Sequence, residues 1–276
     1  MIEKCLFPVA GYGTRFLPAT KSMPKEMLPI VNKPLVQYGV EEAIAAGMTN
    51  CALVTGRGKR AIADHFDISY ELEHQIAGTS KERYLAGIRE VIDRGVFTMV
   101  RQREMRGLGH AILTGEPLIG DQPFGVVLSD DLCLNPDGPG VLAQMAALYE
   151  TFRCSIVAVQ EVALEDTPQY GVVAGTAERE GLLRVTEMVE KPPPEKAPSN
   201  LAVIGRYILT PDIFDVLRST APGANGEIQL TDALQVQARE GRVLAYRFQG
   251  RRFDCGSVPG FVEATQHVFE HYYGRD

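Results

Sequence analysis

The chain has 276 residues, of which 45% are hydrophobic and 23% charged, and its formal net charge is -7. This acidic balance excludes a general nucleic-acid surface, which needs a net basic field, so no nucleic-acid partner is expected. No apolar run reaches the roughly 18 residues that span a bilayer, and no signal segment opens the chain, so we expect no membrane partner and a cytoplasmic location. The five cysteines show no CxxC spacing, which argues against a disulfide framework and a zinc cluster.

The first predicted strand, residues 5–9, is continuously apolar, as in a buried parallel strand. Small residues follow it and let backbone N–H groups approach an anion closely. They are Ala10, Gly11 and Gly13. Three cations come within about a dozen further positions: Arg15, Lys21 and Lys25. Because a nucleoside triphosphate needs several fixed donors and cations, this loop predicts a triphosphate site.

Two better-known glycine loops do not fit. The dinucleotide fingerprint requires a third glycine where this chain has Phe16. The Walker A loop requires Gly-Lys-Ser/Thr opening a helix, whereas Pro18 and Pro24 interrupt any helix here. A glycine turn that merely joins a strand to a helix leaves the cations unexplained.

The loop and its continuation, GYGTRFLPATKSMPKEMLPIVNKPL, resemble the signature of the sugar-1-phosphate nucleotidylyltransferases, Gly-x-Gly-Thr-Arg followed by Pro-x-Thr and Pro-Lys. The longer form is similar to the bacterial branch that makes UDP-glucose and pyrophosphate from UTP and glucose 1-phosphate. The match continues at intervals to Gly256 and covers most of the chain. The resemblance implies that Arg15 and Lys25 are catalytic. It also implies nucleotide contacts for Ala10, Gly11, Gly13, Thr14 and Glu26.

A helix is predicted at residues 35–46 and a second buried strand at 51–55, which together with the first strand form one βαβ unit. Residues 59–95 are predicted to be mostly helical and charged, as a solvated flap or an oligomer contact. A further strand at 97–100 leads into RQREMRGLGHAI and a helix. By resemblance, Gln102 and Gly107 read the base; the alternative is an ordinary turn with a helix start.

The apolar strand at residues 124–128 ends in Ser129, Asp130 and Asp131. Ligands bind open α/β sheets at the carboxyl ends of strands, and two adjacent acids on a strand point to opposite sides, so we expect one of them to face the site. The resemblance assigns Asp130 to Mg²⁺ and leaves Asp131 as the second choice. Capping of the next helix is the alternative for Asp131.

After a helix at residues 141–152 and a strand at 155–159, short strands separated by Gly, Pro and charge suggest a β-rich subregion from about residue 167. Glu190 and Lys191 precede three prolines, so a stiff, extended backbone is expected there. In the resembling family this motif binds sugar hydroxyls and phosphate. Gly171 and Val203 match positions whose backbones touch the sugar, although a strand glycine can also mark a bulge.

Helices are predicted at residues 208–217 and 227–240. Glu227 is near the sugar in relatives, and the alternative is a first-turn acid that interacts with the helix dipole. A strand at 243–248 leads to RFDCGS, where the resemblance assigns Asp254 to Mg²⁺ together with Asp130. A docking or oligomer helix is predicted for 258–273.

The expected fold is α/β: a Rossmann-like nucleotidyltransferase domain with a mixed, mostly parallel sheet flanked by helices and a smaller β-rich sugar-binding subregion. We expect one domain over 1–276, with a nucleotide part at about 1–165, a sugar part at about 166–257 and a C-terminal helix at about 258–276. UTP, glucose 1-phosphate and Mg²⁺ are the implied substrates and cofactor, in a homo-oligomer, a dimer or a tetramer. Alternatives are dTTP, CTP or another sugar 1-phosphate, and a non-catalytic regulatory paralogue.

Overall fold

The computed structural model describes residues 1–223 and 226–274, and most predicted elements are present there within one or two residues. Asn225, at the predicted opening of the 227–240 helix, and positions 275–276 of the expected C-terminal helix lie outside the described residues. The strands are β1 Lys4–Pro8, β2 Pro29–Ile30, β3 Lys33–Pro34, β4 Asn50–Thr55, β5 Val96–Arg101, β6 Phe124–Val127, β7 Asp131–Leu134, β8 Ser155–Glu161, β9 Gly171–Arg179, β10 Leu182–Glu190, β11 Leu201–Leu209, β12 Val243–Arg247 and β13 Arg251–Asp254. The helices are α1 Leu35–Ala45, α2 Arg60–His65, α3 Tyr70–Ile76, α4 Ala86–Arg94, α5 Leu108–Ile119, α6 Val141–Phe152, α7 Ile213–Ser219, α8 Leu230–Arg239 and α9 Val258–Val268.

In the described part of the chain, one large sheet has the strand order β5-β4-β1-β6-β11-β8-β12-β10-β9. The half formed by β5, β4, β1 and β6 is parallel, which confirms the predicted βαβ unit. Strand β11 runs antiparallel to both β6 and β8, and β10 runs antiparallel to β12 and β9. The sheet is therefore mixed, as predicted, but antiparallel pairings are as frequent as parallel ones along this order.

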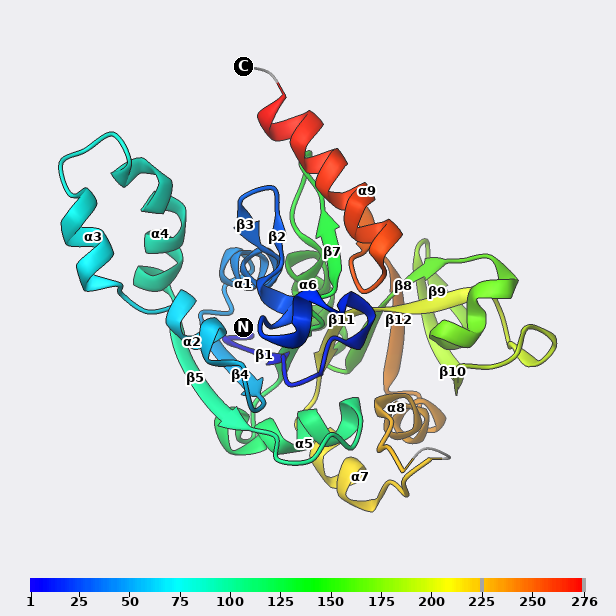
Figure 1. The fold of residues 1–276 in the computed structure, drawn as a ribbon. Coiled ribbons are helices and arrows are strands. Elements are labelled where there is room, and N and C mark those ends of the chain that lie inside the picture. The colour runs from blue at the N-terminus through cyan, green and yellow to red at the C-terminus, as the bar shows by residue number, and fades with distance from the viewer. Residues whose placement is uncertain (224–225, 275–276) are drawn as a thin grey trace.

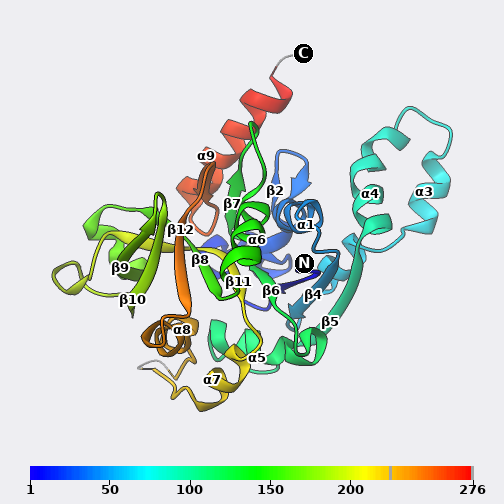
Figure 2. The ribbon, with the colours of Figure 1, turned by 180° about the vertical axis from the view of Figure 1, so that it is seen from behind.

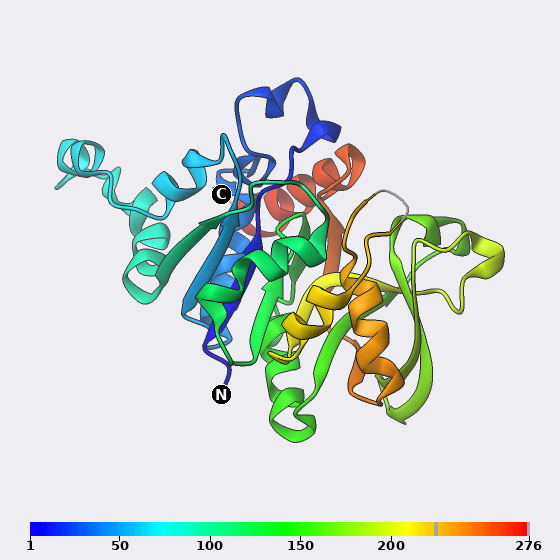
Figure 3. The ribbon, with the colours of Figure 1, turned by 90° about the horizontal axis from the view of Figure 1, so that it is seen from below.

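Helices cover both faces of the sheet, as Figure 1 shows. On one face, α1 and α6 pack with residues such as Val40 and Leu142 in a continuous apolar core; Figure 2 shows these two helices from behind. On the other face, α5, α7 and α8 contribute Ile112, Leu217 and Leu234 to a second core, and Figure 3 shows these green, yellow and orange helices side by side. Burial of both faces explains why the central strands are apolar along their whole length.

The predicted β-rich subregion is present, and its strands belong to the main sheet. Strands β9 and β10 form an antiparallel hairpin that extends the main sheet beyond β12, and β9 also pairs with β11 at Leu201 and Ala202. The predicted helix over 208–217 is wrong in its first residues, because Ile208 and Leu209 belong to β11 and the helix α7 begins at Ile213. Both residues are fully buried and pair with β6, and this tertiary pairing outweighs their local pattern.

Two elements project from this body in Figure 1: the α3–α4 arm and the C-terminal helix α9. Helix α9 runs on into a turn at Phe269–Tyr273, which confirms the helix predicted for 258–273. It packs on the β2–β3 and β7–β13 ribbons through a small third core that includes Leu35, Phe253 and Ala264. None of the helices in the described residues is long and apolar enough to cross a membrane.

A buried ion pair supports the turn between β6 and β7. The Arg206 guanidinium is 1% exposed and donates from Nε and Nη2 to Glu42 Oε2, at 3.0 and 2.9 Å. Its Nη1 donates to the carbonyl oxygens of Leu128 and Gly205, and the other Glu42 oxygen accepts from Leu142 N. Because every charged group has partners, this pair avoids the large cost of an uncompensated buried charge and holds the turn that follows β6.

Candidate active site

Two adjoining cavities open where the carboxyl ends of β1, β5 and β6 meet. The first, here called the carboxylate cavity, has a volume of about 280 Å³ and contains most of the predicted charged residues. They are Arg15, Asp130, Asp131, Glu190, Lys191, Glu227 and Asp254, together with Gly171 and Val203. The second, here called the glycine cavity, has about 300 Å³ and is lined by Ala10, Gly11, Gln102 and Gly107. Leu108 and Glu227 line both cavities, so the two form adjacent compartments of one site.

The loop after β1 turns sharply because Gly13 adopts the left-handed conformation, with φ 68°. A side chain at this position would also press on Lys25, since an added Cβ would lie 3.0 Å from Lys25 Cβ. The hydroxyl of Thr20 donates to the Gly13 carbonyl at 2.7 Å and closes the loop. Phe16 packs edge-on against Phe261 of α9, with ring centroids 5.5 Å apart, and this contact anchors the loop to the C-terminal helix.

Three predicted charged side chains converge around Gly256. A methyl group built on Gly256 would lie 3.1 Å from Asp254 Oδ1, 3.2 Å from Arg15 Nη1 and 3.3 Å from Asp130 Oδ2. Gly256 also donates its N–H to Asp254 at 3.0 Å and accepts from Arg15 at 3.3 Å. The missing side chain therefore leaves a small space bordered by two carboxylates and a guanidinium, although these residues are more than 100 positions apart in the sequence.

This donor set fits a magnesium ion. Mg²⁺ prefers oxygen ligands, and proteins often hold it with one or two carboxylates while water and substrate phosphates complete the shell. Asp130 and Asp254 supply two such carboxylates on one small space. Within the described residues there is no group of three or more His, Cys, Asp or Glu side chains that would form an all-protein metal cage.

Lys25 and Asp130 form an ion pair, with Lys25 Nζ 2.5 Å from Asp130 Oδ2. Burial acts to lower the pKa of Lys25, but Asp130 and Glu26 together raise it above its ordinary value. Burial acts to raise the pKa of Asp130, and the charges of Lys25 and Arg15 hold it below its ordinary value. Both groups are therefore charged at neutral pH, and here each neutralises the other.

Asp130 and Asp131 have different environments. The expectation that only one of them faces the site is wrong, because both line the carboxylate cavity: Asp130 lies in the turn before β7, where strand alternation does not apply. The Asp131 carboxylate, however, is held by Arg252 and by the Gly205 N–H. Asp131 opens a strand and caps no helix, so the capping alternative is wrong. Asp130 remains the carboxylate beside Lys25, as the resemblance implies.

Gly107 and Glu227 form the wall shared by the two cavities. Gly107 has φ 91°, and an added Cβ would lie 2.8 Å from the Ile228 carbonyl oxygen, so only glycine fits this position without strain. Ile228 N donates to the Arg106 carbonyl oxygen at 2.8 Å, which joins the segment before α8 to this loop. Because α8 begins only at Leu230, Glu227 is not a first-turn acid, and it faces both cavities instead.

Glu190 and Gly171 face each other across the β9–β10 ladder. Glu190 Oε2 accepts a hydrogen bond from Thr231 Oγ1 at 2.7 Å, and an added Cβ on Gly171 would lie 2.9 Å from the same hydroxyl. Gly171 therefore makes room for this contact, and the ladder's bulges lie elsewhere. Lys191 departs from the expected extended backbone: its φ is 47°, and its N–H donates to the Tyr170 carbonyl oxygen at 2.9 Å.

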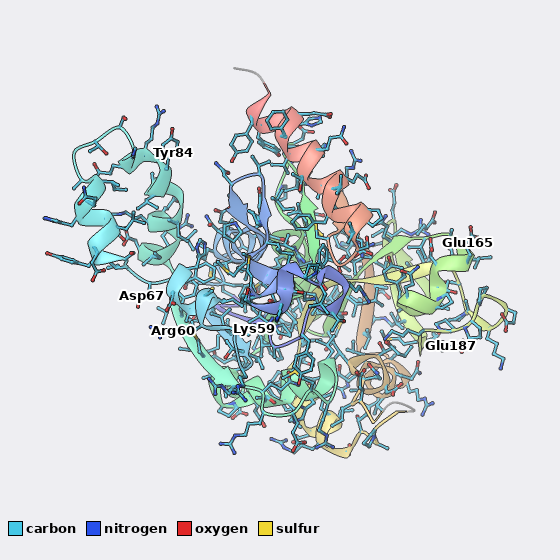
Figure 4. The ribbon with its side chains drawn as sticks, in the orientation of Figure 1. Lys59, Arg60, Asp67, Tyr84, Glu165 and Glu187 are labelled. Carbon is cyan, nitrogen blue, oxygen red and sulfur yellow. The ribbon has the colours of Figure 1, made fainter. Side chains whose placement is uncertain are left out.

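Five predicted residues do not line either cavity: Gly13, Thr14, Lys21, Lys25 and Glu26. Gly13 and Lys25 lie directly behind the Asp130 side of the site, as described above. Glu26 is 1% exposed and accepts a hydrogen bond at 2.7 Å from Lys59, which is labelled in Figure 4. Its other oxygen is buried and accepts no hydrogen bond from the described residues. Burial raises the pKa of Glu26 although Lys59 and Lys25 oppose the shift.

Several lining residues escaped the sequence interpretation. Tyr12 and Met105 line the glycine cavity, and Tyr170, Thr231 and Arg252 line the carboxylate cavity. Tyr12 and Tyr170 are immediate neighbours of predicted residues, so their position in the sequence was a usable signal. Thr231 and Arg252 act through Glu190 and Asp131, and only the folded chain shows those pairs.

Comparison with known proteins identifies what this chain is similar to. The nucleotidyl transferase family matches residues 8–271. A UTP--glucose-1-phosphate uridylyltransferase of Pseudomonas aeruginosa is 67% identical over 273 residues, which cover 99% of this chain and 98% of that protein. The crystal structure of an apo UDP-glucose pyrophosphorylase has a TM-score of 0.95 at 61% identity and covers 98% of this chain and 99% of its own. The structure of a UDP-glucose pyrophosphorylase complexed with UDP-glucose has a TM-score of 0.92 at 58% identity, with the same coverage.

Proposed function

This chain belongs to the nucleotidyl transferase family, and from that membership and the site we propose that it transfers the uridylyl group of UTP to glucose 1-phosphate. The products are UDP-glucose and pyrophosphate. The same activity is named for the Pseudomonas relative, which aligns with nearly the whole chain.

The observation that carries the proposal is the pair of adjoining cavities with different linings. The glycine cavity offers backbone, amide and apolar surface, which suits a nucleotide base. The carboxylate cavity offers Glu190 for hydroxyl groups and Lys191 and Arg15 for phosphate, which suits a sugar phosphate. Two compartments that share one wall support an end-to-end arrangement of the two substrates, which the transfer requires.

The reaction needs no covalent enzyme intermediate. A phosphate oxygen of glucose 1-phosphate attacks the α-phosphorus of UTP, and a new P–O bond forms there. The bond from the same phosphorus to the pyrophosphate oxygen breaks in line with the attack, and the leaving group keeps its electron pair. The attacking oxygen is already ionised at neutral pH, so the protein's contribution is positional and electrostatic.

We assign the charged side chains to parts of this reaction. Arg15 and Lys25 offset the charge of the triphosphate, and Lys191 holds the incoming phosphate. The Lys25 ammonium lies 2.5 Å from the Asp130 carboxylate here, and we infer that it turns toward the phosphates when the nucleotide binds. Ala10, Gly11, Gly13 and Thr14 belong to the triphosphate loop, and Gln102 and Gly107 to the base site.

Asp130 and Asp254 would hold Mg²⁺ in the space around Gly256. When bound there, the ion supplies positive charge that neutralises the phosphates during transfer. Asp131 is left out of this assignment, because Arg252 and Gly205 already occupy its two oxygens.

Glu190→Gln tests the sugar side of the site. The substitution keeps an oxygen that can accept from Thr231 but removes the charge that strengthens hydrogen bonds to sugar hydroxyls. A charged hydrogen bond contributes about 1.5–3 kcal/mol, so we expect the KM for glucose 1-phosphate to rise about 10- to 100-fold. The KM for UTP should stay unchanged in the same steady-state assays.

Glu187→Gln is the matched control, because Glu187 lies on the same strand but is exposed and outside both cavities; Figure 4 labels it on the β9–β10 side. Equal effects of the two substitutions would contradict the assignment of Glu190. A rise in the KM for UTP alone would move Glu190 to the nucleotide side.

The finer description of the chain is also part of this proposal. We assign residues of about 1–165 to a Rossmann-like nucleotide part, about 166–257 to a sugar part and about 258–276 to a C-terminal helix within one domain. Val262, Phe269 and Tyr272 of the C-terminal segment are each more than half exposed, which supports self-association through it. The five free thiols fit a reducing compartment and support a cytoplasmic location.

A further inference from the structure

The amide of Gln102 is fixed by two contacts at one end. Gln102 as a whole residue is 4% exposed, and it lines the glycine cavity. The Nε2 atom lies 2.9 Å from His110 Nδ1 and 3.5 Å from the Gly107 carbonyl oxygen. A backbone hydrogen bond from Gln102 N to Thr55, at 2.8 Å, fixes the position from which the side chain extends.

These contacts determine which end of the amide carries the hydrogens. A carbonyl oxygen only accepts, so the group facing Gly107 must be the NH₂ group of Gln102. The same NH₂ group contacts His110 Nδ1, which must therefore accept and leave the ring proton on Nε2. Burial and the charge of Arg106 lower the pKa of His110, against the opposite effect of Glu104, and so favour this neutral ring.

The carbonyl end of Gln102 is consequently the end available to a ligand. Gln102 Oε1 accepts no hydrogen bond from the described residues. It is also not completely buried, because the fully buried side-chain atoms without a hydrogen-bond partner in those residues are Glu26 Oε1 and Ser129 Oγ. Backbone N–H groups of Ala10, Gly11 and Gly107, residues that line the same cavity, likewise donate no hydrogen bond within the described chain. The cavity thus presents one side-chain acceptor among backbone donors.

Uracil and cytosine differ at the atoms that such a lining contacts. Uracil has an N3–H donor between two carbonyl oxygens, whereas cytosine has an unprotonated N3 acceptor beside an amino donor. An acceptor placed among N–H donors matches uracil and opposes the N3 lone pair of cytosine. A freely rotating glutamine amide would match either base, because its two ends have opposite hydrogen-bonding character.

We propose that His110 is a positioning residue that locks the Gln102 amide with its oxygen toward the base and thereby selects UTP over CTP. This inference rests on the proposed uridylyl transfer and names the residue that enforces its base preference. His110 lines neither cavity, so it acts through Gln102 and not by touching the nucleotide.

The test compares His110→Phe with His110→Asn by measuring pyrophosphate release with UTP and with CTP, each with glucose 1-phosphate. Phenylalanine keeps a flat ring but has no acceptor. Asparagine places Oδ1 close to the position of Nδ1 and can accept from Gln102. We expect His110→Phe to lower the ratio of kcat/KM for UTP to that for CTP by about 10- to 100-fold, mainly through KM, whereas His110→Asn retains most of the preference.

His65→Phe is the matched control, because His65 Nε2 contacts Gln37 Oε1 at 2.9 Å in a second histidine–glutamine pair away from both cavities. This variant should keep the nucleotide ratio of the unaltered chain. An unchanged ratio in His110→Phe, or an equal loss in His110→Phe and His110→Asn, would overturn the inference. Absence of pyrophosphate release with UTP from the unaltered chain would instead overturn the proposed function on which it rests.

Discussion

Lys25→Ala should lower kcat by about 10²- to 10³-fold, the effect of removing one fixed positive donor from a reacting centre. The side chain lies behind Asp130 at the meeting point of Arg15, Asp130 and Asp254, where charge changes during transfer. The free energy of unfolding should change by only about 1 kcal/mol or less. Asp130 is 29% exposed and keeps Arg15 nearby, so the carboxylate is not left buried and uncompensated.

Lys33→Ala provides the control for this experiment. Lys33 pairs with Glu41 at 2.6 Å, and the side-chain exposures of that pair, 29% and 31%, are close to the 25% and 29% of Lys25 and Asp130. Both substitutions should therefore shift a urea unfolding curve by similar small amounts, while only Lys25→Ala loses turnover. If Lys25→Ala lost activity only in proportion to its loss of folded protein, its catalytic assignment would be refuted.

Asp130→Asn is expected to lower kcat by about a hundredfold or more and to shift the Mg²⁺ titration of activity to higher concentration. Charge stabilisation by a bound metal is worth several kcal/mol, and each 1.4 kcal/mol is a factor of ten in rate. Binding of Mn²⁺ as a magnesium substitute, followed by electron paramagnetic resonance, gives a readout that does not depend on turnover. An unchanged metal titration together with unchanged Mn²⁺ binding would rule out Asp130 as a ligand.

Asp131→Asn distinguishes the two adjacent acids. Its carboxylate holds Arg252, which is 9% exposed at the side chain, so the substitution leaves a largely buried cation with only the more distant carboxylate of Asp254, at 3.8 Å. We expect a loss of stability of about 3–5 kcal/mol, with Mn²⁺ affinity of the folded fraction retained. Loss of Mn²⁺ binding from folded Asp131→Asn would make Asp131 the metal ligand instead.

Local pattern predicted the fold well where each element is decided by its own residues. The apolar runs of β1, β4 and β6 and the amphipathic helices α1 and α6 lie within one residue of the expected bounds, because burial on both sheet faces requires those runs. The β-rich subregion was predicted from its short strands, but its attachment to the main sheet through β9 and β11 depends on long-range pairing. Sequence pattern does not encode such pairing.

The functional site likewise contains residues that local motifs predicted and partners that only long-range contacts reveal. Most of the residues found from the motifs line one of the two adjoining cavities: Ala10, Gly11 and Gln102 line the glycine cavity, and Arg15, Asp130, Glu190 and Asp254 line the carboxylate cavity. Their partners were not found, because Lys59 lies 33 positions from Glu26 and Arg252 lies 121 positions from Asp131. The strand alternation expected for Asp130 and Asp131 failed because the first of them sits in a turn, where backbone direction depends on the contacts of that turn.

Pyrophosphate release from the purified chain with glucose 1-phosphate and Mg²⁺, supplied separately with UTP, dTTP, CTP or ATP, tests the central claim most directly. We predict that release is fastest with UTP and is abolished by a chelator. Release led by another nucleotide would contradict the base assignment while preserving the chemistry. The absence of release with every nucleotide, from folded protein that still binds UDP-glucose, would contradict the catalytic account itself.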